Sequence, residues 1–495
     1  MIRRISVFLA LVVIFAIHCQ AQVGNPLPPI VANHYERVST HDELMQFVRT
    51  IESPSVFFQV SIEGKTSQDR EIPMITITER HPSTDAPKLT TMVFCSQHGN
   101  EPSGKEAALI FARECAEGKH NDLFKHMNLL LLPTMNPDGN EAATRTNGNK
   151  ADLNRSHLTL LQPESRALHD VFERIRPEVT LDVHEFGAGG REWEQAGYVR
   201  VMDEQFGAPT NLNVSPEIRE DITNNLFPYL DAQLASHRIR FFNYTIMGGP
   251  GDTVRHSTTD INDGRQSFAI LNTYSLILEG RNGGGFNADL KRRVTNQHAA
   301  ITSFLIYVAD NAENIAELVH TGRNRLPRNH DPVVLQMNHI HNGETLAVPV
   351  KNLATGKDSS VAMKFASSVK PLLFVKRPHG YIVPASNTAL HSFLDRHHIV
   401  YTLLDHDMEY RVESAIIDGF GVKMVEGDSV FLPLVSRKEG TRFFHTGDLL
   451  ITLDQLRSTM IVIALEPESM WGLVQYKEFA SLLQAGKEYP VYRIL

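Results

Sequence analysis

Four side chains that could bind or use a metal ion stand where apolar runs of the sequence end. His98 and Glu101 follow one such run, His184 follows another, and Glu279 closes a third. Taken alone, His98 and Glu101 could be a polar turn before a helix. Two histidines and one carboxylate, however, are a ligand set of catalytic zinc that leaves a fourth position for water. The three residues His98, Glu101 and His184 therefore predict one Zn²⁺ per chain.

Glu279 is the candidate proton acceptor for a zinc-activated water. It ends the very apolar stretch SLIL, where a carboxylate is costly unless it has a partner or a role. Partial desolvation would raise its pKa toward the range that suits a general base. The alternative is an ion pair with Arg281. Asp152 and Asp182 are natural acceptors for the second ring nitrogen of a ligand histidine.

Residues 136–157 are rich in Asn and Gly and are predicted to form a surface loop that carries Arg145 and Arg155. Guanidinium groups bind carboxylates through paired hydrogen bonds and stabilise developing oxyanions. Either arginine could instead be an ordinary exposed charge. Several other histidines lie in helical or loop segments without a partner pattern and are set aside: His120, His126, His157, His169 and His237.

The elements that would position these residues alternate between strands and helices. Apolar runs typical of strands that are covered on both faces lie at 89–98, 127–139, 178–187 and 273–281, and helical periodicity lies between them at 102–118, 163–177 and 224–238. This alternation predicts a three-layer α/β domain with a mixed, largely parallel central sheet. Sites in such sheets form outside the carboxyl ends of the strands, where these polar residues stand.

The flanking segments predict two further parts. Residues 1–21 combine a basic start, an apolar stretch and small residues before Ala21, which predicts a signal peptide and export to the periplasm or the extracellular space. A membrane anchor, or a lipid on Cys19, is the alternative. Residues 22–330 would form the catalytic domain. Short strand-like runs, interrupted by one helical piece at 387–404, predict a smaller β-rich C-terminal domain over 335–495.

Length and composition narrow the class of protein. A chain of 495 residues exceeds one ordinary core, and a formal net charge of -9 offers no general attraction to nucleic acid or anionic lipid. No segment after the signal peptide reaches transmembrane length. Cys95 and Cys115 are predicted to be buried free thiols, with a single disulfide as the alternative. Two thiols are too few for a cysteine-based metal site, so any metal is held by His, Asp or Glu.

The motifs HGNE, NPDG, DLNR, LDVH and LILEGR occur in that order, and together they resemble the zinc metallocarboxypeptidase family of carboxypeptidase A. The resemblance covers roughly residues 40–310, and the stretch from Leu465 onward is similar to the tails of large exported bacterial members. It implies a carboxypeptidase-like fold and the hydrolysis of C-terminal peptide bonds. Zinc would be bound by His98, Glu101 and His184.

The resemblance also implies roles for five other residues. Glu279 would be the general base and later the proton donor, and Arg145 would stabilise the tetrahedral oxyanion. Asn154 and Arg155 would hold the free C-terminal carboxylate of a peptide substrate, and Asp152 would orient the first ligand histidine.

The chain departs from the family pattern at several positions. Ser156 follows Arg155 where members often carry Asn, and Asn100 stands where digestive members carry an extra arginine. The mobile tyrosine of the family could be Tyr244 or Tyr274. The sequence therefore predicts neither the side-chain preference nor the choice between exo- and endo-action, and it indicates no oligomeric state.

The sequence therefore predicts an exported zinc metallocarboxypeptidase. One alternative is a zinc amidase that acts on N-acyl amino acids or on a cell-wall peptide, because the acylase branch of the superfamily also uses HGNE and DLNR. The motif NPDG and the long tail favour the peptidase. The other alternative is a non-catalytic binding module with a degenerate site, which the complete set of ligands and base disfavours.

Overall fold

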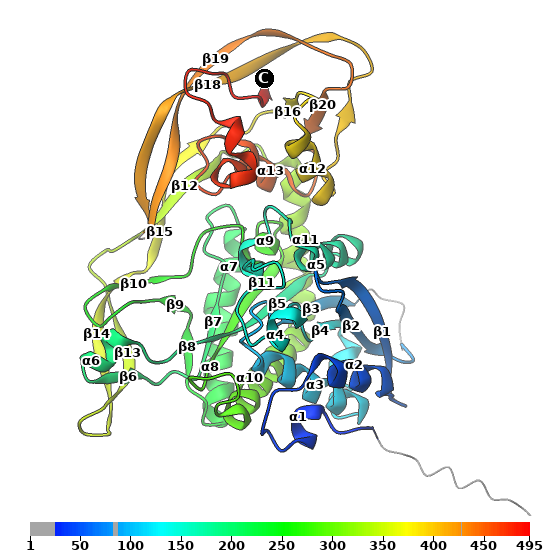
Figure 1. Cartoon of the computed structure of the whole chain (residues 1–495), viewed down its shortest axis with the longest axis vertical. Helices are drawn as coiled ribbons and strands as arrows, with labels where there is room; N and C mark the ends of the chain where they lie inside the picture. Colours follow the sequence, from blue (N-terminus) through cyan, green and yellow to red (C-terminus); the bar gives the residue numbers. More distant parts are fainter. Residues whose placement is uncertain (1–24, 83–87, 427) are drawn as a thin grey trace, which may run out of the picture.

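An eight-stranded mixed sheet forms the centre of the first 330 residues (Figure 1). The computed structural model describes residues 25–82, 88–426 and 428–495. The strand order is β1-β2-β4-β3-β5-β11-β7-β8, and the four central strands β4, β3, β5 and β11 run parallel. The strands are β1 (Val56–Lys65), β2 (Glu71–Glu79), β3 (Leu89–Cys95), β4 (Met127–Leu132), β5 (Val179–Phe186), β7 (Glu204–Gly207), β8 (Phe241–Asn243) and β11 (Tyr274–Arg281).

Helices cover both faces of this sheet, because alternate residues of its strands are apolar on both sides. In β4, Leu129 and Leu131 join one core cluster while Leu130 and Leu132 join another. The first cluster includes residues of α2 (His41–Thr50), α3 (Ser103–Ala116), α8 (Phe227–Ser236), α10 (Leu290–Asp310) and α11 (Ala312–Arg325). The second includes α5 (Pro163–Ile175) and α9 (Gly264–Ala269). The predicted three-layer α/β domain is confirmed.

Local sequence signals are visible in several elements of the N-terminal part. Thr40 caps α2, with its side chain accepting from the Glu43 amide at 3.2 Å while a Glu43 oxygen accepts from the Thr40 amide at 2.9 Å. Strands β1 and β2 form an antiparallel hairpin. Cys95 and Cys115 are buried and unpaired, as predicted. Short helices complete this part: α1 (Pro29–Ala32), α4 (Pro137–Glu141), α6 (Arg191–Gln195) and α7 (Pro216–Asp221).

The C-terminal part is rich in strands, as predicted. A six-stranded sheet has the order β17-β20-β16-β21-β18-β19, and β12 pairs with β15. These strands are β12 (Val333–Ile340), β15 (Ser368–Val375), β16 (Gly380–Val383), β17 (Thr402–Leu403), β18 (Met408–Val425), β19 (Asp428–Phe444), β20 (Leu449–Thr452) and β21 (Tyr492–Ile494). The predicted helix is α12 (Thr388–Arg396), and a second one, α13 (Ser458–Leu465), was not predicted.

Strands from both sides of residue 330 share one sheet. Its order is β6-β13-β14-β10-β9, formed by β6 (Tyr198–Arg200), β9 (Thr245–Ile246), β10 (Thr253–His256), β13 (Thr345–Asn352) and β14 (Asp358–Ala366). The second core cluster is also shared, since it joins Phe94 and Phe172 to Phe393 and Ile461 of the C-terminal part. The domain boundary near 330–335 stays a prediction.

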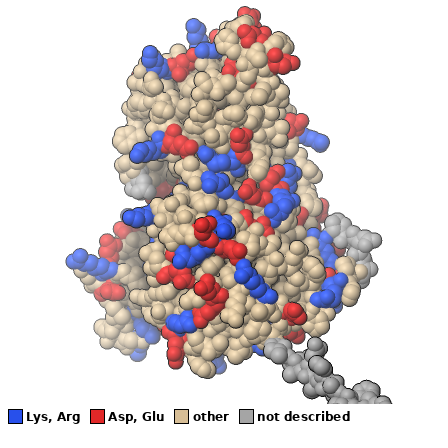
Figure 2. All heavy atoms as spheres, turned by 45° about the vertical axis from the view of Figure 1, so that its right-hand side comes forward, with Lys and Arg blue, Asp and Glu red and all other residues tan. Residues whose placement is uncertain are grey.

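The ends and surface of the chain add two observations. The predicted signal peptide at 1–21 lies outside the described residues. In the described part of the chain, none of the helices combines the length and the apolarity that crossing a bilayer requires. On the face that Figure 2 shows, acidic and basic side chains are interspersed, and neither sign forms a continuous field there.

Candidate metal centre and active site

Three neighbouring parallel strands carry the predicted chemical residues to one edge of the central sheet. His98 and Glu101 lie in the turn between β3 and α3, His184 lies in β5, and Glu279 lies in β11. Glu279 is the register partner of His184, so both side chains leave the sheet on the same face. The carboxyl ends of these strands therefore form one polar site.

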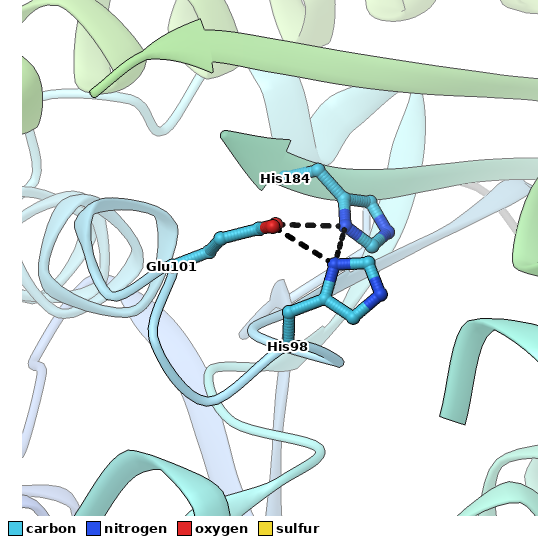
Figure 3. Close-up of side chains that lie close together, drawn as sticks. All are labelled: His98, Glu101 and His184. Carbon is cyan, nitrogen blue, oxygen red and sulfur yellow. Dashed lines mark hydrogen bonds and ion pairs between the residues drawn. The ribbon is translucent and has the colours of Figure 1, made fainter. Parts of the chain in front are cut away.

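The three predicted metal ligands converge on one point (Figure 3). Nδ1 of His98 lies 2.9 Å from one carboxylate oxygen of Glu101, and Nδ1 of His184 lies 3.0 Å from the other. The two Nδ1 atoms are 3.1 Å apart. All three side chains are buried, and their ligand atoms lie within 4.8 Å of one another. Among the described residues, this is the group of three His, Cys, Asp or Glu side chains whose possible ligand atoms lie that close together.

Neighbouring carboxylates set the tautomers of both histidines. Nε2 of His98 lies 3.1 Å from Asp152, and Nε2 of His184 lies 2.8 Å from Asp182. An ionised carboxylate only accepts, so each Nε2 carries the hydrogen and each Nδ1 presents its lone pair to the other. Two facing lone pairs beside a carboxylate repel unless a cation lies between them. This donor set fits a divalent metal ion such as Zn²⁺.

The charges around the site agree with that reading. Burial lowers the pKa of His184, but Asp182 and Glu101 outweigh it and raise that pKa well above its ordinary value. Burial raises the pKa of Glu101, but the two histidines outweigh it and hold that pKa well below its ordinary value. The backbone amide of Glu185 also donates to Glu101, at 3.0 Å. The surroundings of His184 thus favour a positive charge at the place that a metal cation would fill.

A buried network that the sequence did not indicate holds Asp182 in place. The side-chain amide of Gln97 donates to both Asp182 oxygens, at 2.9 and 2.8 Å, and its carbonyl oxygen lies 2.7 Å from Nε2 of His157. His157 in turn lies 3.1 Å from His169. His157 and His169 were set aside because neither has a local pattern, so only the tertiary fold places them behind the site.

Glu279 lies beside the three ligands and is 7% exposed. Burial, with a smaller contribution from Glu101, raises the pKa of Glu279 to about 7. Arg281 pairs with Asp203 at 2.6 Å, so the predicted alternative of an ion pair with Glu279 does not describe this structure.

The two tyrosines left open by the sequence have different surroundings. Tyr274 donates to Asp221 at 2.8 Å within the core. Tyr244 hydrogen-bonds to Glu279, and burial together with that carboxylate raises the pKa of Tyr244 well above its ordinary value. Of the two, Tyr244 is therefore the one that lies at the site.

Two of the predicted substrate-binding residues contact the candidate metal ligands or their partners, and the third is next to them in the chain. Arg145 is half exposed, donates from Nε to Asp152 at 3.0 Å, and places another nitrogen 3.6 Å from Glu101. Asn154 is buried, and its amide nitrogen lies 3.5 Å from His184. Arg155 is exposed and follows directly. The structure thus brings all eight predicted site residues to one edge of the sheet.

A solvent-open hollow of about 810 Å³ lies next to this site. Two of the residues that line it place it there. Asn100 precedes Glu101 in the chain, and Arg281 lies two residues after Glu279 in β11. Much of its wall is backbone, because Gly187, Gly189 and Gly190 on one side face Gly283, Gly284 and Gly285 on the other. The metal ligands therefore stand beside a space that can admit a polymer chain.

Comparison with known proteins decides the family. Residues 44–188 match the family described as zinc carboxypeptidase. This part of the chain belongs to that family. The zinc carboxypeptidase region contains His98, Glu101 and His184 together with Arg145, whereas Glu279 lies beyond it. The resemblance predicted from the motifs is confirmed, and the chain is a member of the metallocarboxypeptidases, which are enzymes.

Known proteins extend the similarity beyond the matched region. "Carboxypeptidase 2" of Trichophyton tonsurans is 24% identical over 468 residues, which cover 92% of this chain and 86% of the relative. "Carboxypeptidase SOL1" of Arabidopsis thaliana is 27% identical over 157 residues, covering 26% and 32% of the two chains. A solved metallo-carboxypeptidase from Burkholderia cenocepacia is 18% identical, with a TM-score of 0.42 over 55% of this chain and 69% of that one.

Proposed function

We propose that this protein is an exported, zinc-dependent carboxypeptidase that removes residues from the C-terminal end of peptides, with Glu279 as general base. The observation that carries the proposal is the convergence of His98, Glu101 and His184 beside Glu279, the register partner of His184. The names of the similar proteins support peptides as substrates. Export is proposed from the sequence of residues 1–21 alone.

Each residue of the site has a task that its surroundings suit. Zn²⁺ held by the three ligands would supply a Lewis acid that polarises the scissile carbonyl and activates water. Glu279 takes the proton of the attacking water and later gives it to the leaving amine, which requires a pKa near the working pH. Tyr244 hydrogen-bonds to Glu279 and orients it.

The cationic side chains select the substrate. Arg145 is tied to Asp152 and lies at the mouth of the metal site, where a guanidinium can stabilise a developing oxyanion. Asn154 and Arg155 would bind the free carboxylate of the substrate terminus. The side-chain oxygen of Asn154 already accepts from the Gly264 amide at 2.8 Å, so the side-chain nitrogen faces the site as a donor.

A single digestion experiment tests the proposal. The purified protein is incubated with a library of peptides that carry free or amidated C-termini, with and without a chelator, and the products are read by mass spectrometry. We expect stepwise loss of residues from free C-termini only, and none after chelation. The Glu279→Gln variant should keep about one zinc per chain and lose at least about a thousandfold in kcat.

The outcomes also separate the alternatives. Cleavage of N-acyl amino acids with peptides left intact would identify an amidase instead. Full activity in Glu279→Gln would remove the glutamate from its assigned role. A protein that neither holds stoichiometric zinc nor cleaves any substrate would be a binding module with a degenerate site.

A further inference from the structure

The tip of the long β18–β19 hairpin lies against the segment that supports the proposed carboxylate-binding residues. This hairpin spans Met408–Val425 and Asp428–Phe444, and Glu426 follows directly after its first strand. We propose that Glu426 of the C-terminal part is a positioning residue for substrate binding, acting through Thr259 and Asn262 on Asn154 and Arg155. The proposal rests on the proposed function, because it assigns the grip on the substrate carboxylate to those two residues.

The first contact joins Glu426 to Thr259. One carboxylate oxygen of Glu426 accepts from the Thr259 amide at 3.0 Å and from the Thr259 hydroxyl at 3.1 Å. The same hydroxyl accepts from the indole nitrogen of Trp471 at 3.1 Å. Thr259 is fully buried. Two C-terminal residues therefore hold it, while Asn211 of the N-terminal part donates to its carbonyl oxygen at 2.8 Å.

The second step runs from Thr259 along the chain to the substrate site. Asn262 is buried, its side-chain nitrogen donates to the Arg155 carbonyl oxygen at 2.7 Å, and its side-chain oxygen accepts from the Leu158 amide at 2.6 Å. Two residues later, the Gly264 amide donates to Asn154. A displacement of the segment 259–264 would therefore move both Asn154 and Arg155.

The surroundings of Glu426 indicate that its carboxylate is built into this junction. The Glu426 side chain is 4% exposed. It lies 3.7 Å from Arg255 of the N-terminal part and 3.3 Å from His339 of the C-terminal part, so it has partners in both parts of the chain. A buried carboxylate without partners would be costly, so this arrangement needs all of these contacts together.

The backbone at Glu426 is in an unfavourable conformation for a glutamate. Its φ is 54°, in the left-handed region that glycine and asparagine occupy more readily. Strain of this kind persists where the surrounding structure requires a particular side chain. It also offers a useful variant, because Glu426→Gly removes the carboxylate while glycine fits the left-handed backbone, so relief of that strain offsets part of the stability lost with the buried contacts.

The test compares steady-state kinetics of the full-length zinc-loaded enzyme on a free-carboxylate peptide that the wild type cleaves. We expect Glu426→Gly to raise KM by about tenfold, within the range that small misplacements of positioning groups produce, with kcat changed less than about twofold. Glu426→Gln keeps one acceptor oxygen for Thr259 and should raise KM less. The matched control is Glu439→Gln on the same hairpin, whose ion pair with Arg411 is exposed, and its KM should not change.

Two further readouts keep the outcomes distinct. Hydrogen exchange in residues 257–264 should become faster in Glu426→Gly, while zinc content stays at the wild-type level. An unchanged KM, or a loss of kcat and zinc together with the rise in KM, would overturn the proposal. If the wild type cleaves no peptide, the proposed function fails by itself. Hydrogen exchange then tests by itself whether Glu426 holds this segment in place. Unchanged exchange at 257–264 in Glu426→Gly would overturn the proposal.

Discussion

At the scale of single residues, Glu279 and His184 show how the register of a parallel sheet places two chemical groups side by side. They are paired across adjacent parallel strands, so the proposed base and the proposed metal ligand face the same space without any long loop to fix them. The same geometry buries Glu279, and burial disfavours its charged form. The buried position of Glu279 in its strand therefore sets how strongly its carboxylate binds a proton.

That burial predicts how pH acts on the metal-free protein. The pKa of Glu279 is about 7 in the folded state against 4.5 for an unperturbed glutamate. Its proton therefore stabilises the fold, with a contribution that is complete below pH 4.5 and lost as the pH rises through 7. A Gln residue at this position resembles the protonated form at every pH. In chelated protein, Glu279→Gln should gain about 1–3 kcal/mol relative to wild type between about pH 5 and about pH 8.

Urea unfolding of both proteins at the two pH values measures this difference. Glu439→Gln is a suitable control, because Glu439 is exposed in its pair with Arg411. A stability difference between Glu279→Gln and wild type that does not change with pH would contradict the raised pKa. Zinc must be absent, since its charge beside Glu279 would favour the carboxylate and lower the pKa.

At the scale of elements, the start of α9 packs directly behind the metal site. Gly264 is the first residue of α9, and a Cβ there would meet an Asp182 oxygen at 2.4 Å and the Gln97 amide nitrogen at 2.6 Å. Both groups belong to the network that orients His184. Gly264→Ala should therefore displace Asp182 and weaken zinc binding by about 10–100-fold, the usual cost of disturbing such partners.

Competition with a chelator of known affinity measures that loss. The matched control is Gly251→Ala, because a Cβ at Gly251 meets nothing within 4 Å. We expect the control to bind zinc as the wild type does. Zinc affinity in Gly264→Ala within about twofold of wild type would show that α9 can yield without moving Asp182.

Elements with local signals could be predicted, and those set by distant pairing could not. The capping box at Thr40 and the apolar run Leu129–Leu132 are local sequence signals for α2 and β4, and β4 lies where the sequence predicted it. The segment Ser458–Leu465 is apolar from Met460 onward, and such a run suits a buried strand and a buried helix equally. For the same reason, Gln97 and Glu426 could not be singled out, because their partners lie far away in the sequence.

The proposed metal ligands and Glu279 could be singled out as candidates because each stands where an apolar run of the sequence ends, a place where a polar side chain needs a partner or a role. His157 could not, since its contact with Gln97 depends on how the loop after Arg155 folds back under β3. The hollow beside the site also left no sequence signal beyond scattered glycines. Residue types therefore indicated the chemistry of the candidate site, whereas the residues that hold it in place could be identified only from the tertiary structure.

At the scale of the whole molecule, the two parts share a core as well as a sheet. Phe94 and Phe172 of the N-terminal part pack in the same cluster as Phe393 and Ile461 of the C-terminal part. Removing everything after residue 330 would expose the N-terminal residues of this cluster and leave β10 without its partner β14. The hydrophobic free energy that is lost when so large an apolar area becomes exposed exceeds the few kcal/mol by which domains are stable.

We therefore expect a chain that ends at residue 330 to be insoluble or to lack a cooperative thermal transition, because the C-terminal part completes the core. Far- and near-UV circular dichroism with a dye that binds exposed apolar surface measures this. Co-expression of residues 331–495 as a separate chain is the control, and it should restore solubility and zinc binding, since the shared cluster can form between two chains. A truncated chain that melts within about 5 °C of the full protein would show instead that the N-terminal part folds as an independent domain, with the C-terminal part resting on it.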